Sequence, residues 1–349
     1  MKIAIEGIGV AGGFGCGLAA LRSAMEKGNV SPQSRTIHSA KGDMDVPALL
    51  TGTSLLTDFI PWKSLRRNDH YTRMALLGSF LAMEDAGLRQ DRKTDLNNMG
   101  IIVATGLGST CNTLDFEDIV AGNNAACSPT RFSNSVHNAA AAHISIFLNA
   151  CGPNLSINQF DMSLPSAILT ACCWLEEERT ETVLVGGVDE FSNVMAYYRH
   201  NCFAGDGKNR IPVGEGCAFF LLTAKAEQAR YGYILDAAAG NAEKGKIPVP
   251  ADAAVFCDRE SYEDQRQDYE RHLEKNQPMV SCSHLYGNIP VGMGFDMAIA
   301  SLGFQTGISC LSFGDILRTG SPISPAGPVC CLKINPAGEY GMITISPAL

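Results

Sequence analysis

The chain has 349 residues, which is long enough for two lobes that each bury a hydrophobic core. Hydrophobic residues make up 46% of the sequence and charged residues 18%, a balance typical of folded proteins rather than disordered ones. The net charge of -9 argues against a nucleic-acid backbone or an anionic membrane surface as a partner.

The cysteine content indicates the cellular compartment. There are 13 cysteines, an odd number, and two pairs are adjacent in the sequence (Cys172 with Cys173, and Cys330 with Cys331). A secreted disulfide scaffold does not fit this pattern, so we expect reduced thiols. No run of ~18 apolar residues is present, and the N-terminal residues lack the regions of a signal peptide. We therefore expect a cytoplasmic protein with no membrane insertion. Spacings typical of metal ligands are absent, so no metal is expected.

Strands and helices alternate along the chain. We predict strands over 2–6, 101–105, 154–160, 182–187, 216–223, 231–239, 329–334 and 340–345. We predict helices over 17–27, 71–86, 138–149, 163–178, 261–275 and 294–304. This alternation predicts an α/β protein with layered sheets. The charges of the 261–275 helix alternate in sign, which is typical of a solvated surface.

Glycines between the first strand and the first helix fit a known nucleotide-binding pattern. Gly7, Gly9 and Gly12 match G-x-G-x-x-G. A dinucleotide site also needs an acidic residue about 20 positions later, at the end of a second strand. The sequence there continues as helix and loop. We therefore interpret the glycines as a turn needed for close packing, and we expect no cofactor.

Six segments carry a family resemblance. They are GIGV (7–10), RRNDHYTRMALLGSFLAMEDAGL (66–88), GIIVATGLGS (100–109), SVHNAAAAHISIFLNACGPNLSINQ (135–159), TVLVGGVDE (182–190) and GDGKNRIPVGEGCAFFLLTAKAEQARYGY (205–233). In this order they resemble the β-ketoacyl synthases of the thiolase superfamily. The resemblance implies a five-layered α-β-α-β-α fold with two pseudo-equivalent lobes and a dimer. It divides one compact unit into an N-terminal ketosynthase-like lobe, 1–240, and a shortened C-terminal lobe, 241–349.

The family's catalytic positions are occupied by other residue types. Such enzymes use a cysteine nucleophile at a helix N-terminus and two histidines. Counting from the glycine-proline turn at 152–153 places the cysteine at Asp161, which is a poor acyl acceptor from a thioester. Its carboxylate is instead expected to cap the helix. Similar counts place the two histidines at Phe256 and Asn288, and a lysine at Ser283.

The resemblance therefore predicts a non-catalytic subunit, a chain-length factor. Such a factor pairs with an active ketosynthase in a heterodimer and shapes the tunnel for a growing acyl or polyene chain. It belongs to type II polyketide or fatty-acid synthases, here of an aryl-polyene-like kind. Chain-length factors often carry glutamine in place of the nucleophile, and Gln159 lies two positions early for that role. Because the chain is acidic, the acyl carrier protein is expected to dock mainly on the partner.

Two groups of residues follow from this resemblance. The strand before the nucleophile position is expected to pair antiparallel across the twofold axis. Its interface candidates are Asn154, Ser156, Asn158 and Gln159. The candidates for limiting product length lie in segments 113–120 and 190–198, and an ordinary core role is the alternative for each. They are Thr113, Phe116, Phe191 and Met195.

Other functions remain open from the sequence. The chain could be an active condensing enzyme or acyl-ACP decarboxylase that uses unconventional residues such as Asp161 with His284, or a stand-alone acyl-binding protein. Cys257 follows Phe256, and a catalytic thiol facing the expected active site is the alternative to a buried hydrophobic role for it. Glu215 matches a glutamate that the family buries, so we interpret it as structural.

Overall fold

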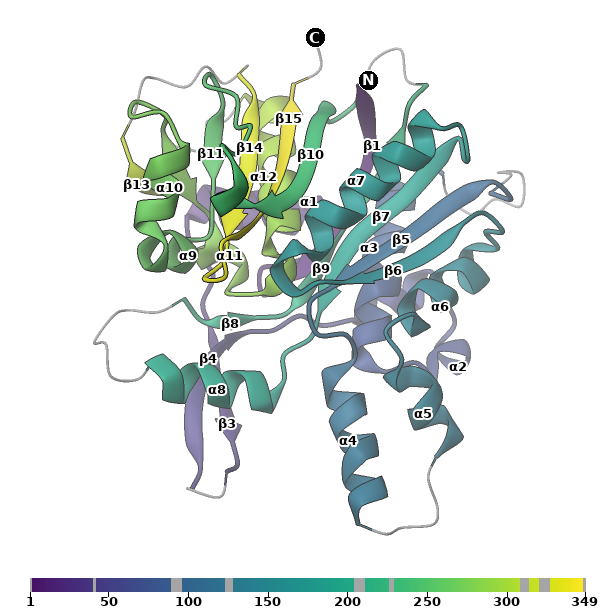
Figure 1. Ribbon diagram of the computed structural model, residues 1–349. Coiled ribbons are helices and arrows are strands. Elements are labelled where there is room, and N and C mark those ends of the chain that lie inside the picture. The colour runs from purple at the N-terminus through teal and green to yellow at the C-terminus, as the bar shows by residue number, and fades with distance from the viewer. Residues whose placement is uncertain are drawn as a thin grey trace.

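The computed structural model describes residues 2–39, 42–88, 96–122, 128–203, 211–225, 229–307, 314–319 and 327–347. Within them a large mixed sheet is flanked by helices (Figure 1), which confirms the predicted α/β thiolase-like class. No helix in these ranges is both long and apolar enough to cross a membrane.

The strands fall into two groups and one small sheet. The first half contributes β1 (Ile3–Gly12), β2 (Gly15–Cys16), β5 (Met99–Thr105), β6 (Asn154–Asn158), β7 (Thr182–Asp189) and β9 (Gly216–Thr223). The second half contributes β10 (Tyr233–Asn241), β11 (Ala254–Phe256), β12 (Met279–Ser281), β13 (Asp315–Arg318), β14 (Val329–Ile334) and β15 (Glu339–Ser346). A separate sheet joins β3 (Gln33–Ile37), β4 (Met44–Leu49) and β8 (Val213–Gly214).

The helices follow the same division. The first half contains α1 (Gly17–Lys27), α2 (Trp62–Leu65), α3 (His70–Asp85), α4 (Thr110–Ala121), α5 (Pro129–Ser135), α6 (Ala139–Leu148), α7 (Ser163–Glu176) and α8 (Asn193–Phe203). The second half contains α9 (Arg259–Asp264), α10 (Arg266–His272), α11 (Ser283–Tyr286) and α12 (Met293–Thr306). Short 3₁₀ turns, η2 (Phe160–Met162) and η4 (Pro290–Gly292), precede the two central helices α7 and α12.

The two halves repeat one strand order. In the first half β6, β5 and β7 are parallel neighbours, and β9 and β1 continue antiparallel. In the second half β12, β11 and β14 are parallel, and β15 and β10 continue antiparallel. A short antiparallel contact between β1 and β10 joins the halves. This repeat supports two pseudo-equivalent halves, the second beginning with β10, shortly before the division expected at residue 240.

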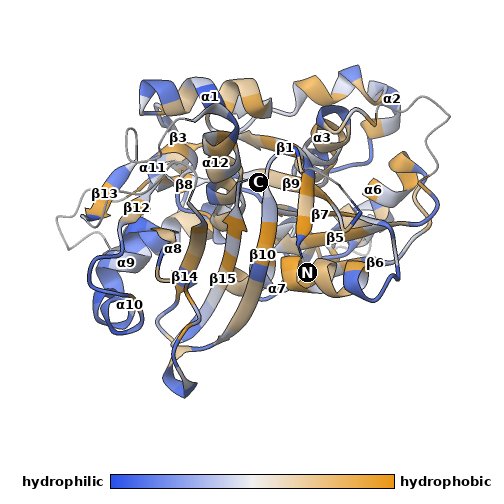
Figure 2. Ribbon diagram, turned by 90° about the horizontal axis from the view of Figure 1, so that it is seen from above, coloured by the Kyte–Doolittle hydropathy of each residue, from blue (hydrophilic) through white to orange (hydrophobic). Residues whose placement is uncertain are grey.

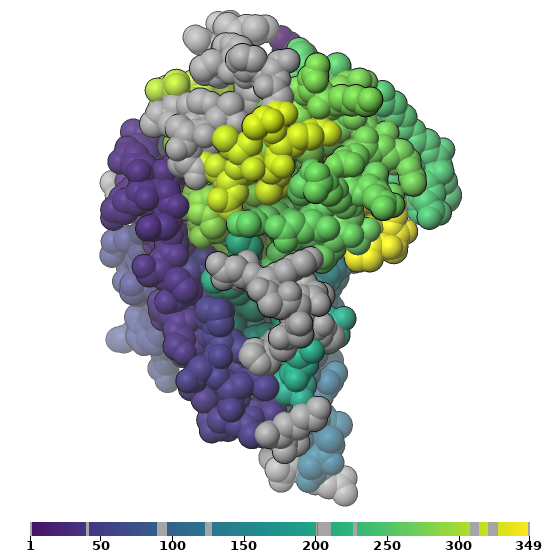
Figure 3. Space-filling view, turned by 90° about the vertical axis from the view of Figure 1, so that its left-hand side faces the viewer, coloured from purple at the N-terminus to yellow at the C-terminus, as the bar shows by residue number. Residues whose placement is uncertain are grey.

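Three hydrophobic clusters fill the spaces between the helices and the strands. Helices α3 and α6 pack on the outer face of the first-half strands. Helices α7 and α12 pack between the two groups of strands. Helices α9 and α10 cover the outer face of the second half, with a hydrophilic outer surface (Figure 2). On the face shown in Figure 3, the green surface of second-half segments occupies the upper right, with purple first-half segments along the left and teal ones below.

The glycine pattern near the N-terminus lies in a strand. Gly7 and Gly9 are inside β1, where α3 crosses the sheet, so the predicted turn is wrong. The packing reason is correct, because a Cβ at Gly9 would overlap the backbone of Gly78 and Ala82. Glycine therefore permits the close approach of a helix to the strand.

The predicted helix over 261–275 is also broken. It consists of α9 and α10, which are separated at Gln265 with φ -115° and ψ 26°. Asp258 begins this segment as the N-cap of α9, where its carboxylate accepts the N–H groups of Glu260 and Ser261. Because Asp258 is the cap, the helix starts at Arg259, two residues earlier than hydrophobic periodicity predicts.

Candidate functional site

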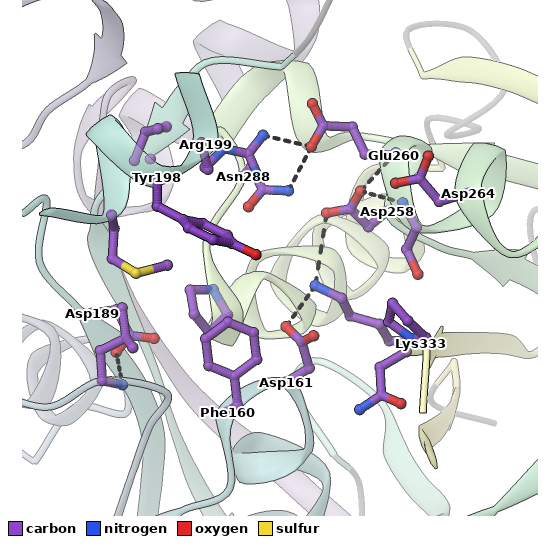
Figure 4. A pocket seen from close by; sticks show the side chains of 18 of the residues that line it. Phe160, Asp161, Asp189, Tyr198, Arg199, Asp258, Glu260, Asp264, Asn288 and Lys333 are labelled. Atoms are coloured by element: carbon purple, nitrogen blue, oxygen red, sulfur yellow. Dashed lines mark hydrogen bonds and ion pairs between the residues drawn. The ribbon is translucent and has the colours of Figure 1, made fainter. Parts of the chain in front are cut away.

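A cavity of about 280 Å³ lies at the N-terminal end of α7, between the two halves of the fold. Most of its apolar lining comes from the first half, whereas both halves contribute charged side chains (Figure 4). The side chains that line it include Leu107, Phe160, Asp161, Glu190, Met195, Tyr198, Arg199, Asp258, Glu260, Asn288 and Lys333.

A sharp turn carries the chain from the edge strand β6 into α7. Phe160 has a φ of 50°, a left-handed conformation that a bulky residue adopts only where its surroundings impose it. Ser163 supports the turn, because its hydroxyl accepts the N–H of Gln159 and donates to the carbonyl of Thr105. The Phe160 ring is 45% exposed and lies at the cavity.

Asp161 forms an ion pair inside this cavity. Lys333 Nζ lies 2.8 Å from Asp161 Oδ1 and 3.9 Å from Asp258 Oδ2, and all three side chains are largely buried. Burial alone would lower the pKa of Lys333, but the two carboxylates raise it above its usual range. Helix α7 has no side-chain cap among the described residues, so the expected capping role of Asp161 is wrong.

A second buried ion pair lies beside the first. Arg199 Nη2 is 2.6 Å from Glu260 Oε2, and the amide of Asn288 donates to the same carboxylate oxygen at 2.9 Å. The other oxygen of Glu260 accepts the N–H of Ile211. These contacts satisfy the charge of Glu260, as a buried carboxylate requires. Asn288 therefore serves here as a hydrogen-bond donor to Glu260.

The structure brings two of the three expected catalytic positions to the cavity. Asp161 and Asn288 line it, whereas Phe256 ends β11 with 1% exposure in the central core. Asp258, two residues after Phe256, lines the cavity instead. Cys257 packs into the outer core with Tyr262 and Tyr269. Among the described residues that line the cavity there is no cysteine and no histidine.

The four chain-length candidates are dispersed. Met195 on α8 lines the cavity with Asp161. Phe191 is buried in a small cluster formed with β3 and β4. Thr113 and Phe116 lie on α4, where the Phe116 ring packs at 5.7 Å against the ring of Phe132 on α5. Only Met195 of these four shares a cavity with Asp161 among the residues that the structure describes.

Strand β6 forms one edge of the large sheet. Ile101 N–H donates to the carbonyl of Pro153, and β6 runs parallel to β5. In a parallel ladder this register turns the N–H groups of alternate residues toward β5. The interface candidates Asn154, Ser156 and Asn158 therefore direct their backbone groups to the open edge. The Ser156 hydroxyl is buried without a hydrogen-bond partner in the described structure.

Two consecutive acidic residues end β7. Asp189 accepts hydrogen bonds from the Thr105 hydroxyl and the N–H groups of Gly106 and Leu107, and burial raises its pKa to about 6. Glu190 accepts the N–H of Cys111, and burial raises its pKa to about 7. Both carboxylates thus hold the segment between β5 and α4.

A second cleft of about 540 Å³ lies on the other side of Glu190. Glu215 is buried at its base, as expected, and accepts hydrogen bonds from Thr51 N–H, Phe191 N–H and the His70 ring. Burial would lower the pKa of His70, but the hydrogen bond to Glu215 and its charge raise it. Glu215 therefore joins three segments, which is the structural role we assigned to it.

Sequence reasoning missed the charged side chains of the cavity other than Asp161. Lys333 interrupts the otherwise buried strand VCCLKI (329–334), and a charge at such a position indicates a buried ion pair. Asp258 is of a residue type that is preferred at helix N-caps, directly before α9. Arg199 and Glu260 carried no distinguishing pattern, because residues far apart in the sequence become neighbours only in the fold.

Comparisons with known proteins identify the family. Residues 18–227 match the family model of the β-ketoacyl synthase N-terminal domain. Nodulation protein E of Rhizobium leguminosarum bv. trifolii is 25% identical over 244 residues, which cover 66% of this chain and 60% of that relative. The matched part is thus less than two thirds of the relative's length.

Solved structures show the same fold over nearly the whole chain. The ishigamide ketosynthase/chain length factor has a TM-score of 0.76 at 17% identity, with 99% of each chain covered. A β-ketoacyl synthase from Burkholderia phymatum STM815 has 0.76 at 16%, also with 99% of each. The ketosynthase in complex with its chain length factor from Xenorhabdus doucetiae has 0.76 at 12%, covering 99% of this chain and 98% of that one. By its sequence match and its fold, the chain belongs to the β-ketoacyl synthase family.

Proposed function

We propose that the chain is a ketosynthase-like subunit without condensing activity of its own, a chain length factor that pairs with an active ketosynthase. The observation that carries the proposal is the ion pair between Asp161 and Lys333, at the position where the family resemblance places the nucleophile. In the complex this subunit shapes the tunnel for the acyl or polyene chain of a type II polyketide-like synthase. We further propose that this synthase is of an aryl-polyene-like kind.

The chemistry of the cavity supports this role. Acyl transfer from a thioester needs a nucleophile whose acylated form is not much higher in energy than the thioester. Acylation of Asp161 would give a mixed anhydride, and its carboxylate is already paired with an ammonium group. The described lining offers neither a thiol nor an imidazole in its place. A partner ketosynthase would therefore supply the cysteine and histidines.

The open edge of β6 supports the pairing. Its outward backbone groups can form antiparallel hydrogen bonds with the same strand of a partner. Solved structures of the same fold include a ketosynthase in complex with its chain length factor. We propose that the acyl carrier protein docks mainly on the partner, because this chain carries a net charge of -9.

The alternative of an active enzyme that uses Asp161 with His284 has less support. His284 on α11 does not line the cavity, and its Nδ1 lies 3.7 Å from Asp315 Oδ2 on β13. Burial lowers the pKa of His284. No described contact joins it to Asp161. A stand-alone acyl-binding role has no observation that favours it over the paired role.

The test compares the isolated chain with the co-expressed complex. The partner to co-express is a ketosynthase that has the catalytic cysteine and both catalytic histidines, chosen from the genes that neighbour the gene of this chain. Acyl transfer and condensation from malonyl-ACP are measured for each sample. We expect turnover only in the complex, with loss when the partner's nucleophilic cysteine is replaced by alanine and retention in Asp161→Asn. Turnover by the isolated chain that Asp161→Asn abolishes would overturn the proposal.

A further inference from the structure

Glu190 stands between the two cavities. Its side chain lines the cavity that contains Asp161 and also the cleft that contains His70. Of the residues that the structure describes, it alone lines both. Glu190 is only 7% exposed although both spaces adjoin it. Its carboxylate is therefore part of the wall that separates them.

The same carboxylate holds the start of α4. Glu190 Oε1 accepts the N–H of Cys111, the second residue of α4, at 2.8 Å. The Cys111 thiol donates to the carbonyl of Phe191 at 3.3 Å, so two hydrogen bonds join Cys111 to the segment of Glu190 and Phe191. The N–H groups of a first helical turn have no partner within the helix, so an acceptor placed there has a large effect.

The other anchor at the start of helix α4 is its N-cap residue Ser109, whose hydroxyl donates to the Asp69 carboxylate; beyond this turn the helix has few contacts with the body of the protein. None of its residues is buried, and it projects away from the sheets beside α5 (Figure 1). Asn112 donates to the carbonyl of Arg131 in the segment of α5, so this contact joins two projecting helices to each other. The position of α4 therefore depends strongly on how its first turn is held.

We propose that Glu190 is a positioning residue: its carboxylate fixes the first turn of α4 and closes the wall between the cavity and the cleft. This inference rests on the proposed function for its consequence, which is that Glu190 limits how far an acyl chain extends beyond Asp161. Replacement by alanine leaves the Cys111 N–H without its acceptor and connects the two spaces. Glutamine restores both, because its amide oxygen can accept the same N–H and its side chain has a similar volume.

The first experiment needs only the isolated chain. Amide hydrogen exchange is measured for wild type, Glu190→Ala and Glu190→Gln. We expect about tenfold faster exchange over residues 111–114 in Glu190→Ala, because the Cys111 N–H loses its acceptor at the start of the helix. Glu190→Gln is expected to stay close to wild type, and the amides of α7 serve as the internal control. Unchanged exchange over 111–114 in Glu190→Ala would overturn the proposal.

A second variant removes the donor instead of the acceptor. Cys111→Pro eliminates both the N–H that Glu190 accepts and the thiol donor to Phe191, within the first helical turn, where proline is tolerated. We expect exchange over residues 112–114 to rise as in Glu190→Ala, with α7 unaffected. This variant keeps the proposal testable if Glu190→Ala does not fold. If α4 stays as protected as in wild type, Glu190 does not position it.

The final experiment measures product length in the complex with the co-expressed ketosynthase. Glu190→Ala is expected to shift the distribution to longer products, and Glu190→Gln to leave it unchanged. If exchange rises but product length does not change, the wall is not the limit and that part is overturned. A wild-type complex that makes no product contradicts the proposed function, while the exchange result still decides the positioning role.

Discussion

Lys333 Nζ on β14 lies 2.8 Å from Asp161 Oδ1 at the turn before α7, so an ion pair joins the two halves of the fold inside one cavity. Asp258 places a second carboxylate 3.9 Å from the same ammonium group. One buried cation thus compensates two buried anions. Removal of the cation should cost more than removal of either anion, because an uncompensated buried charge is strongly unfavourable.

This asymmetry gives a stability prediction. Lys333→Met should lower the free energy of unfolding by about 3 kcal/mol, because it leaves Asp161 and Asp258 without a counter-charge. Asp161→Asn should cost about 1 kcal/mol, since Asp258 still compensates Lys333. Both are measured by urea unfolding. Lys225→Met is the matched control, because its pair with Glu181 is exposed and should contribute little to stability. Equal effects of the two lysine variants would contradict the prediction.

The same pair predicts the reactivity of a thiol introduced at the turn. In Asp161→Cys the new thiol lies near the Lys333 ammonium at the start of α7, and both features favour a thiolate. Iodoacetamide alkylation, followed by peptide mapping against the native cysteines, should show a pH midpoint near or below about 7.5. Adding Lys333→Met should raise that midpoint by about 1 pH unit. An identical midpoint in both variants would mean that the ammonium does not act on position 161.

The edge strand gives a prediction about assembly. In Ser156→Pro the lost N–H faces the open edge, so the pairing of β6 with β5 is kept while pairing with a partner strand is blocked. We expect the co-expressed ketosynthase to be lost from the purified complex and the isolated chain to stay folded. Size-exclusion chromatography and circular dichroism report the two properties. Ser156→Val keeps the N–H and should retain the partner, and retention by Ser156→Pro would argue against this interface.

Secondary-structure elements that depend on local sequence patterns are predicted well, whereas features that depend on contacts between distant residues are not. The helix over 17–27 and the strands over 216–223 and 329–334 were predicted with the bounds that the structure has, because local periodicity and flanking glycines determine them. The helix over 261–275 was wrong because a break at Gln265 leaves the charge pattern unchanged.

The candidate site was less predictable than the elements. Asp161 was identified because its segment resembles that of a known family. Its partner Lys333 is far along the chain on a different strand, and no local pattern links the two. Counting along the sequence assigns the position of a family histidine to Phe256, which is buried in the core. The structure instead brings Asp258 to the cavity, because α9 begins there. Long-range contacts of this kind need the fold before they can be assigned.

A buried carboxyl group on α12 predicts a pH dependence of stability. Asp296 accepts the Tyr286 hydroxyl at 2.8 Å, and burial raises its pKa to about 7. Because the folded pKa lies above the unfolded one, its stabilising contribution is fully present below about pH 4 and is lost as the pH rises through 7.

Asp296→Asn isolates this contribution. The asparagine does not titrate and still accepts the Tyr286 hydroxyl. Between pH 5 and pH 8, the free energy of unfolding of wild type should fall relative to the variant by about 2 kcal/mol. Asp189 and Glu190 share the direction of this shift and are present in both proteins, so they cancel in the difference. Parallel curves over this range would show that Asp296 does not titrate there.

The last prediction concerns the limit on product length in the proposed complex. Met195 lines the cavity that contains Asp161, and Phe116 lies on α4. If these side chains end the tunnel, Met195→Ala and Phe116→Ala each remove a steric stop and should lengthen the product. Val120→Ala is the matched control on α4, because Val120 is 51% exposed. Mass spectrometry of the released chains measures the distribution. Thr113 and Phe191 complete the set, and an unchanged distribution in all four variants would remove these residues from the tunnel.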